Sequence, residues 1–150
     1  MLMQNFVVLL TSFYSAAALS PTNWTDCGLS NATIHFDSVV STNPVHTNEE
    51  QYINKTLELD SVYNNITCEY SQYWKVLGTW FRFLDLKVHT CAEHPQLCNA
   101  KPHTQIFVET IHPPLNKLTP HGLYRSKQHY FDGNTGDLLG CVDMIIPYVK

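Results

Sequence analysis

Alternation between apolar and polar residues constrains this chain most, and it is clearest near the carboxyl end. With period two, one face of the last segment receives Val142, Met144, Ile146 and Tyr148. This is the period of a β-strand that turns one face to a core. The turn-forming stretch 132–137 separates this segment, 138–149, from a second strand over 122–131. The sequence therefore predicts a β-hairpin at this end of the chain.

Shorter segments of the same kind recur upstream, at residues 32–40, 53–59, 74–88 and 104–111. The third is too long for one strand, and Gly78 marks a break in it. Pro113 and Pro114 end the fourth, because proline cannot donate hydrogen bonds to a strand ladder. We find no helical period beyond residue 18. The pattern predicts an all-β fold of six to eight strands in two sheets.

The first 18 residues predict a secretory signal peptide. Residues 6–19 carry no charge and include the small residues 15–18, as expected before a cleavage site. The run is too short for a membrane-spanning helix, which needs about 20 apolar residues. Cleavage after Ala18 leaves residues 19–150, in which no repeat or linker marks a boundary, as one domain. The alternative for the leader is a buried amino-terminal helix.

Four sequons for N-linked glycosylation support secretion. They begin at Asn23, Asn31, Asn54 and Asn65, and none occurs after residue 68. A glycan needs solvent, so Asn31, Asn54 and Asn65 are expected on loops or on outward strand faces. The sequence predicts a glycosylated amino-terminal half, in a secreted protein or one of the endolysosomal lumen.

Five cysteines should pair in an oxidising compartment, with one left over. The turn-forming His94-Pro95 brings Cys91 near Cys98, and a bridge from Cys27 to Cys141 would join the two ends of the domain. Cys68 is then unpaired. We expect it to be a buried thiol; a bridge to another chain and a catalytic nucleophile are its alternatives.

A zinc site is the alternative for His89, Cys91, His94 and Cys98, since two imidazoles and two thiols suffice for tetrahedral coordination. Secretion favours the disulfide instead, and the spacing is not a usual zinc-finger pattern. Motifs of zinc proteases, serine hydrolases, nucleotide-binding loops and dinucleotide folds are absent from the sequence. The sequence therefore predicts no enzyme, no cofactor and no metal site.

The charge pattern bears on partners. The chain has 13 acidic and 9 basic residues and a net charge of −4, which does not favour nucleic acid. It also has 8 histidines, and protonation of all of them would change the net charge to +4. Such a reversal would allow transient contact with anionic membranes at acidic pH.

Three groups of residues carry a resemblance that spans the whole chain after the leader. They are Trp24-Thr-Asp-Cys27-Gly28, the short pair Cys91 to Cys98, and a closing stretch from Gly122-Leu-Tyr124-Arg125 to Gly140-Cys141-Val142. In these residues the chain resembles the ML (lipid-recognition) domain family, which includes the Niemann-Pick type C sterol carrier and the ganglioside-activator proteins. The resemblance is remote, since Cys68 lacks the partner of a third cysteine pair that many members carry.

The resemblance implies an immunoglobulin-like β-sandwich whose sheets part around an apolar cavity for a sterol, a fatty acyl chain or a glycolipid. It also implies the bridges Cys27–Cys141 and Cys91–Cys98. Apolar residues at inward positions are the candidates for the cavity lining: Phe36, Leu57, Leu59, Trp80, Phe83, Leu84, Ile106, Val108, Val142, Met144 and Ile146. We therefore expect a lipid-binding or lipid-transfer protein. The alternative is an extracellular recognition module with a filled core that acts as a receptor accessory protein.

Overall fold

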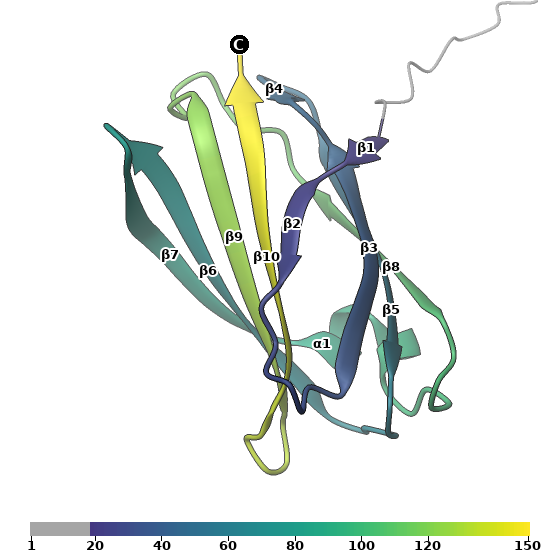
Figure 1. Ribbon diagram of the computed structural model, residues 1–150. Coiled ribbons are helices and arrows are strands. Elements are labelled where there is room, and N and C mark those ends of the chain that lie inside the picture. The colour runs from purple at the N-terminus through teal and green to yellow at the C-terminus, as the bar shows by residue number, and fades with distance from the viewer. Residues whose placement is uncertain (1–18) are drawn as a thin grey trace, which may run out of the picture.

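Two β-sheets face each other across residues 19–150, the part of the chain that the computed structural model describes (Figure 1). The first sheet has four strands in the order β1-β3-β5-β8. Their bounds are Leu19–Pro21 (β1), Ile34–Thr42 (β3), Gln51–Leu59 (β5) and Ile106–His112 (β8). All three strand pairs in this sheet are antiparallel.

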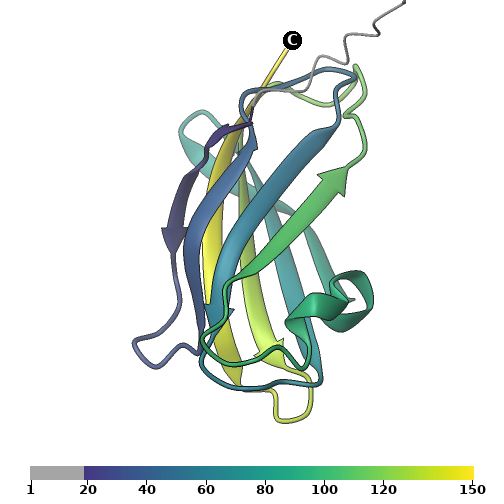
Figure 2. The same cartoon turned by 90° about the vertical axis from the view of Figure 1, so that its right-hand side faces the viewer.

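The second sheet has six strands in the order β2-β10-β9-β6-β7, with β4 paired parallel to the end of β10. Their bounds are Asn23–Asp26 (β2), Val45–His46 (β4), Ile66–Val76 (β6), Thr79–His89 (β7), Gly122–Asp132 (β9) and Leu138–Val149 (β10). Between β7 and β8 lie a short helix, α1 (Thr90–Glu93), and the 3-10 turn η1 (Pro95–Leu97). The predicted all-β, two-sheet sandwich is confirmed (Figure 2).

The prediction of six to eight strands was too low, because the described residues form ten. The additional strands β1, β2 and β4 have only two to four residues each, too few for a period to appear in the sequence. The predicted break at Gly78 is confirmed, since the two-residue turn Leu77-Gly78 joins β6 to β7. Both turn residues have positive φ, 48° and 85°, as a tight hairpin between twisted strands requires.

The core lies where the two sheets meet at close range. Ile34, Leu57 and Leu59 from the first sheet and Ile66, Val142 and Met144 from the second are almost fully buried. Gly140 permits this approach, since a Cβ atom built there would lie 2.8 Å from the Cβ atom of Ile34. Close packing fixes the spacing of the sheets at this end of the sandwich.

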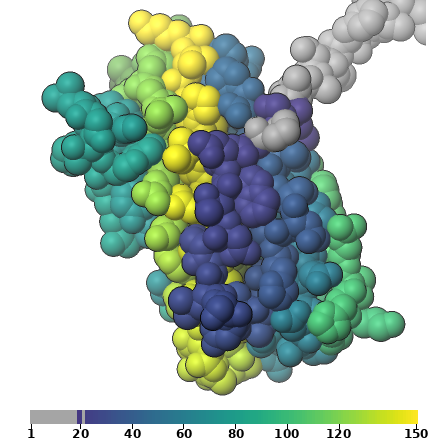
Figure 3. All heavy atoms as spheres, in the orientation of Figure 1, coloured from purple at the N-terminus to yellow at the C-terminus, as the bar shows by residue number. Residues whose placement is uncertain are grey.

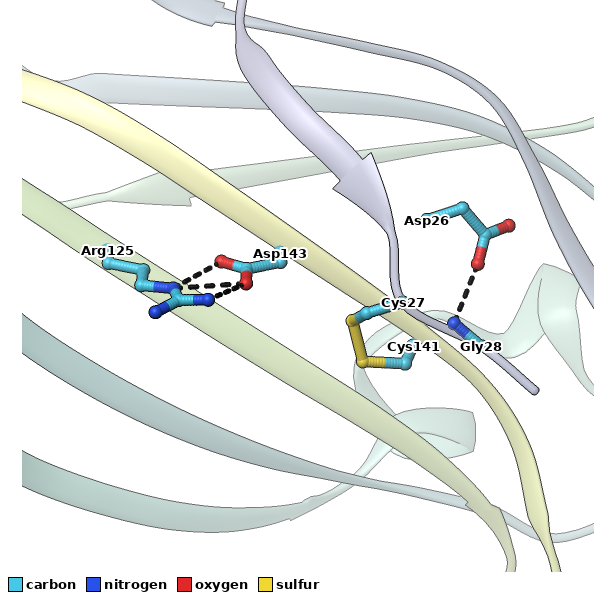
Figure 4. Close-up of a disulfide and its surroundings, with 6 residues drawn as sticks. All are labelled: Asp26, Cys27, Gly28, Arg125, Cys141 and Asp143. Carbon is cyan, nitrogen blue, oxygen red and sulfur yellow. Dashed lines mark hydrogen bonds and ion pairs between the residues drawn. A yellow bond between two sulfur atoms is a disulfide. The ribbon is translucent and has the colours of Figure 1, made fainter.

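A disulfide between Cys27 and Cys141 fastens the residue after β2 to β10 (Figure 4). Beside it, the Nε of Arg125 donates to both carboxylate oxygens of Asp143, at 2.9 and 3.0 Å. The second disulfide joins Cys91 to Cys98 across α1 and η1. Both predicted bridges are confirmed, and Cys68 is a buried free thiol as expected.

The sheets diverge away from this closed end. In Figure 1, β6 and β7 lean away from β5 and β8 towards the top of the view. Strand β7 forms one edge of the second sheet and β8 forms one edge of the first, because each stands at the end of its strand order. The segment 113–121, which joins β8 to β9, spans the top of the gap. This divergence makes room for a cavity.

Candidate functional site

A cavity of about 1090 Å³ lies between the diverging parts of the two sheets. The second sheet contributes side chains from β6, β7, β9 and β10, and the first sheet contributes side chains from β5 and β8. The connecting segment 113–120 covers part of the top, and α1 borders the lower side. The predicted apolar cavity between the sheets is therefore present.

The lining is mainly aliphatic and aromatic. Its apolar side chains include Ile53, Trp74, Leu86, Val88, Tyr124 and Ile146. The cavity is open to solvent along the β7–β8 side, because Leu84, Leu86 and Ile111 line it and are nevertheless 40–52% exposed. Exposed apolar side chains around a hollow of this kind are typical of a binding site for an apolar molecule.

A few polar groups face the same cavity. The indole Nε1 of Trp74 and the hydroxyl of Thr110 are buried there without a hydrogen-bond partner. The amide Nε2 of Gln72 donates to the hydroxyl oxygen of Ser126 at 2.8 Å. The hydroxyl of Tyr148 donates to Thr47 Oγ1 at 3.0 Å near the top. Buried polar groups of this kind fix the orientation of a ligand that satisfies them.

Two histidines in the lining titrate below their usual range. Burial lowers the pKa of His94 and of His112, and the positive charge of Lys55 lowers both further. Burial also lowers the pKa of His129, outside the cavity. The pKa of His35 is raised, through its hydrogen bond to Asp60. Protonation of all eight histidines, which would change the net charge from −4 to +4, therefore requires a lower pH than it would with unperturbed histidines.

A polar cluster lies directly beneath the cavity. Lys55 on β5 points across the sandwich, where its ammonium donates to Gln128 Oε1 at 2.7 Å and to the Tyr130 hydroxyl at 2.9 Å. Burial lowers the pKa of Lys55 to about 8. Cys68 lies in the same layer, and burial raises the pKa of its thiol to about 12.

The environment of Cys68 bears on its two alternative roles. At 0% exposure its sulfur cannot reach another chain in this conformation, so an intermolecular bridge does not fit. A raised pKa keeps the thiol protonated at neutral pH, whereas nucleophilic catalysis needs the thiolate. The residue belongs to the core beneath the cavity.

The structure separates the eleven predicted lining residues into three groups. Phe83, Leu84 and Ile146 line the cavity. Trp80 lies on the outer face of the second sheet, where Lys75 and Arg125 stack on its ring at 5.5 and 6.0 Å. The other seven are buried in the closed core: Phe36, Leu57, Leu59, Ile106, Val108, Val142 and Met144.

Several lining residues were not among those candidates. Tyr70, Gln72 and Trp74 share the inward face of β6, and Leu86 and Val88 continue the inward row of Leu84 on β7. The alternation of residues 84–88 already placed Leu86 and Val88 inward. No local signal in the sequence distinguishes an inward residue that lines the cavity from one that packs in the core. The distance between the two sheets at that residue determines which of the two it is.

The sequence alternative of a zinc site at residues 89–98 was wrong. The disulfide between Cys91 and Cys98 uses both thiols. A different group, Glu58, Asp60 and His103, has ligand atoms within 4.8 Å of one another on the outer face. Asp60 already pairs with His35, with 2.8 Å between Nε2 and Oδ2. We interpret this group as a cluster of polar side chains at the surface.

The sequons lie in different surroundings. Asn23 and Asn31 are exposed, and Asn65 is partly exposed beside the β9–β10 turn. Asn54 faces outward as expected but is only 7% exposed, because β5 is an inner strand between β3 and β8. A glycan at Asn54 would need its neighbours to move. The predicted signal peptide, residues 1–18, lies outside the described residues.

Among residues 19–150, no helix is long and apolar enough to cross a membrane. No protein family and no curated protein matches the sequence. The class of protein is therefore defined by structure: a two-sheet β-sandwich with an apolar cavity between the sheets and two disulfides.

Among solved structures, the chain is similar to a Niemann-Pick type C2 protein from the Japanese carpenter ant. The TM-score is 0.62 at 14% identity, over 84% of this chain and 98% of that chain. The C-terminal domain of wzt matches with a TM-score of 0.51 at 9% identity, over 88% and 74% of the two chains. Chicken MD-1, solved with lipid IVa, has a TM-score of 0.49 at 13% identity, over 84% and 88%. The first similarity shows that the fold is ML-like.

Proposed function

We propose that this protein is a non-enzymatic lipid carrier that holds one lipid molecule between its two sheets. The observation that carries the proposal is the apolar cavity of about 1090 Å³, which opens between β7 and β8. Sites for small organic molecules have volumes of roughly 300–1,000 Å³, so a molecule of lipid size is accommodated. Each methylene group buried contributes about 0.8 kcal/mol, and binding therefore needs no reactive group.

The ML-like fold supports this proposal, because the Niemann-Pick type C2 protein in the comparison has a similar sandwich. The ligand classes that fit are a sterol, a fatty acyl chain and a glycolipid. The alternative recognition module requires a filled core, which the open cavity does not favour. We further propose that residues 1–18 direct the chain into the secretory pathway, where its two disulfides would be stable.

Delivery of a lipid requires contact with a membrane, and one end of the sandwich suits this step. Leu77 at the β6–β7 turn and Leu118 in the β8–β9 segment are almost fully exposed, with Lys75 two residues before Leu77 and Lys117 directly before Leu118. Figure 3 shows the β6–β7 hairpin projecting from the rest of the molecule at the upper left. Exposed apolar side chains with neighbouring basic groups favour an anionic bilayer surface.

The experiment is titration of delipidated protein with a fluorescent fatty acid and a fluorescent sterol, in wild type and two matched variants. Leu86 and Phe107 both lie on edge strands and are 51% and 58% exposed, but only Leu86 lines the cavity. We expect Leu86→Asp to weaken binding at least about tenfold, since a carboxylate would be desolvated by the ligand. Phe107→Asp should bind like wild type. Equal binding by all three proteins, or no uptake by wild type, contradicts the proposal.

A further inference from the structure

Lys55 occupies a position where this fold otherwise places apolar side chains. Its neighbours in the inward row of β5 are Ile53, Leu57 and Leu59, all buried in the cavity wall or the core. Lys55 itself is 2% exposed. A charged side chain in such a place is costly unless it is paired.

The ammonium of Lys55 has hydrogen-bond partners but no counter-ion. It donates two hydrogen bonds, one to Gln128 Oε1 and one to the Tyr130 hydroxyl oxygen. Within residues 19–150, no carboxylate lies within 4 Å of the ammonium nitrogen, and Glu93 interacts with it only through space. The thiol of Cys68 stays protonated at neutral pH, because burial raises its pKa to about 12. The site therefore has one unbalanced positive charge.

This charge lies in the layer directly below the cavity floor. On these two strands the floor is formed by Ile53 (β5) and Ser126 (β9), and Lys55 and Gln128 are the next inward residues. On β6 the lining continues to Tyr70, which pairs with Gln128. The amide of Gln128 reaches back to the Ser126 hydroxyl, at 3.5 Å. A polar connection thus leads from the floor of the cavity to the ammonium.

A second group at the floor lacks an acceptor. Thr110 lies opposite Ile53 in the ladder between β5 and β8 and lines the cavity. Its hydroxyl is buried and has no hydrogen-bond partner. The hydroxyl lacks a hydrogen-bond acceptor, and the ammonium in the adjacent layer lacks a counter-ion. An oxygen atom that accepts hydrogen bonds and carries negative charge would satisfy both.

We propose that the ligand is a lipid with a single carboxylate, a long-chain fatty acid, bound with its carboxylate at the floor near Thr110, Ser126 and Lys55. The inference rests on the proposed lipid-carrier function and specifies the ligand class. The chain of the lipid then lies along Leu84, Leu86 and Ile146 towards the opening. Two acids, Glu93 and Glu109, also line the cavity, but both are exposed, and water screens them far more than it screens Lys55.

The test compares palmitate with cetyl alcohol, which has the same chain length and no charge, as competitors of a fluorescent probe on delipidated protein at pH 7. Wild type should prefer palmitate at least about tenfold, as a hydrogen bond to a charged group predicts. Lys55→Met should lose this preference and keep its affinity for the alcohol. Lys75→Met, on the outer face, should keep the preference.

Each outcome of this comparison decides between hypotheses. Equal affinity of wild type for both ligands, or an unchanged preference in Lys55→Met, overturns the carboxylate proposal while the carrier function stands. No binding of either ligand or of the probe contradicts the carrier function itself.

A second measurement needs no variant. Nuclear Overhauser contacts in the wild-type complex with palmitate should join the methylene next to the carboxylate to the Thr110 methyl group, and the terminal methyl group to Leu118. The opposite pattern places the carboxylate at the opening and overturns the proposal.

Discussion

Replacement of Lys55 by methionine should stabilise the delipidated protein. Burial lowers the pKa of this ammonium from an ordinary value of 10.5 to about 8. One pKa unit corresponds to about 1.36 kcal/mol, so the shift corresponds to a penalty of about 3 kcal/mol at pH 7. Methionine has a similar length and no charge. Gln128 Oε1 still accepts from the Tyr130 hydroxyl at 3.0 Å, so the substitution leaves it satisfied.

The sign of the pH dependence follows from linkage. Because the folded state has the lower pKa, the unfolded state binds more protons between pH 8 and 10.5, and wild-type stability rises across that interval. The advantage of Lys55→Met should therefore fall from about 3 kcal/mol at pH 7 to about 1 kcal/mol at pH 9.5. A methionine has no proton to lose, so the variant itself should show no such rise.

Urea unfolding of the delipidated proteins at the two pH values measures both quantities. Lys75→Met is the control, and its free energy of unfolding should differ from wild type by no more than about 1 kcal/mol, since it loses only an exposed cation–π contact with Trp80. A Lys55→Met protein less stable than wild type at pH 7, or an advantage that does not change with pH, would refute the reasoning that Lys55 is an unbalanced buried charge.

Three further predictions concern the rest of the fold. Cys141→Ser leaves Cys27 unpaired and should lower the free energy of unfolding by about 2–5 kcal/mol; unchanged urea unfolding would count against the bridge. The buried thiol of Cys68 should react with iodoacetamide only after unfolding, and rapid labelling of the native protein, seen by mass spectrometry, would contradict its placement. Asp60→Asn should return the raised pKa of His35 towards 6.5 in an NMR titration. In wild type the pair stabilises the fold below pH 6.5, and this stabilisation is lost as the pH rises through the folded pKa; the variant should lack it. If the substitution leaves the pKa of His35 unshifted, the pair is absent.

The architecture could be predicted from the sequence wherever strands were long enough for alternation to appear. The inward row of Val142, Met144 and Ile146 defined β10, and Gly78 marked the β6–β7 turn. The short strands β1, β2 and β4 could not be predicted, because they exist only through pairing with distant segments of the chain. Pairing of this kind depends on the tertiary structure and leaves no local pattern.

The site was predictable in kind but not in detail. Alternation places Leu57 and Leu84 equally inward, yet Leu57 is in the core and Leu84 lines the cavity, since the sheets are close at one residue and apart at the other. Lys55 reads as an ordinary polar residue in the sequence. Its burial follows from Gln128 and Tyr130, which are more than 70 residues away along the chain and meet it only across the sandwich.

Native mass spectrometry of the protein, expressed with its leader in a eukaryotic secretory host, treated with a glycosidase and ionised gently, tests the carrier function most directly. A carrier should show a protein mass increased by one lipid molecule, which extraction and fragmentation would identify as a fatty acid. After delipidation, incubation with mixed lipid vesicles should restore this complex. A bare protein mass that stays bare after such incubation at neutral and at acidic pH would contradict the account.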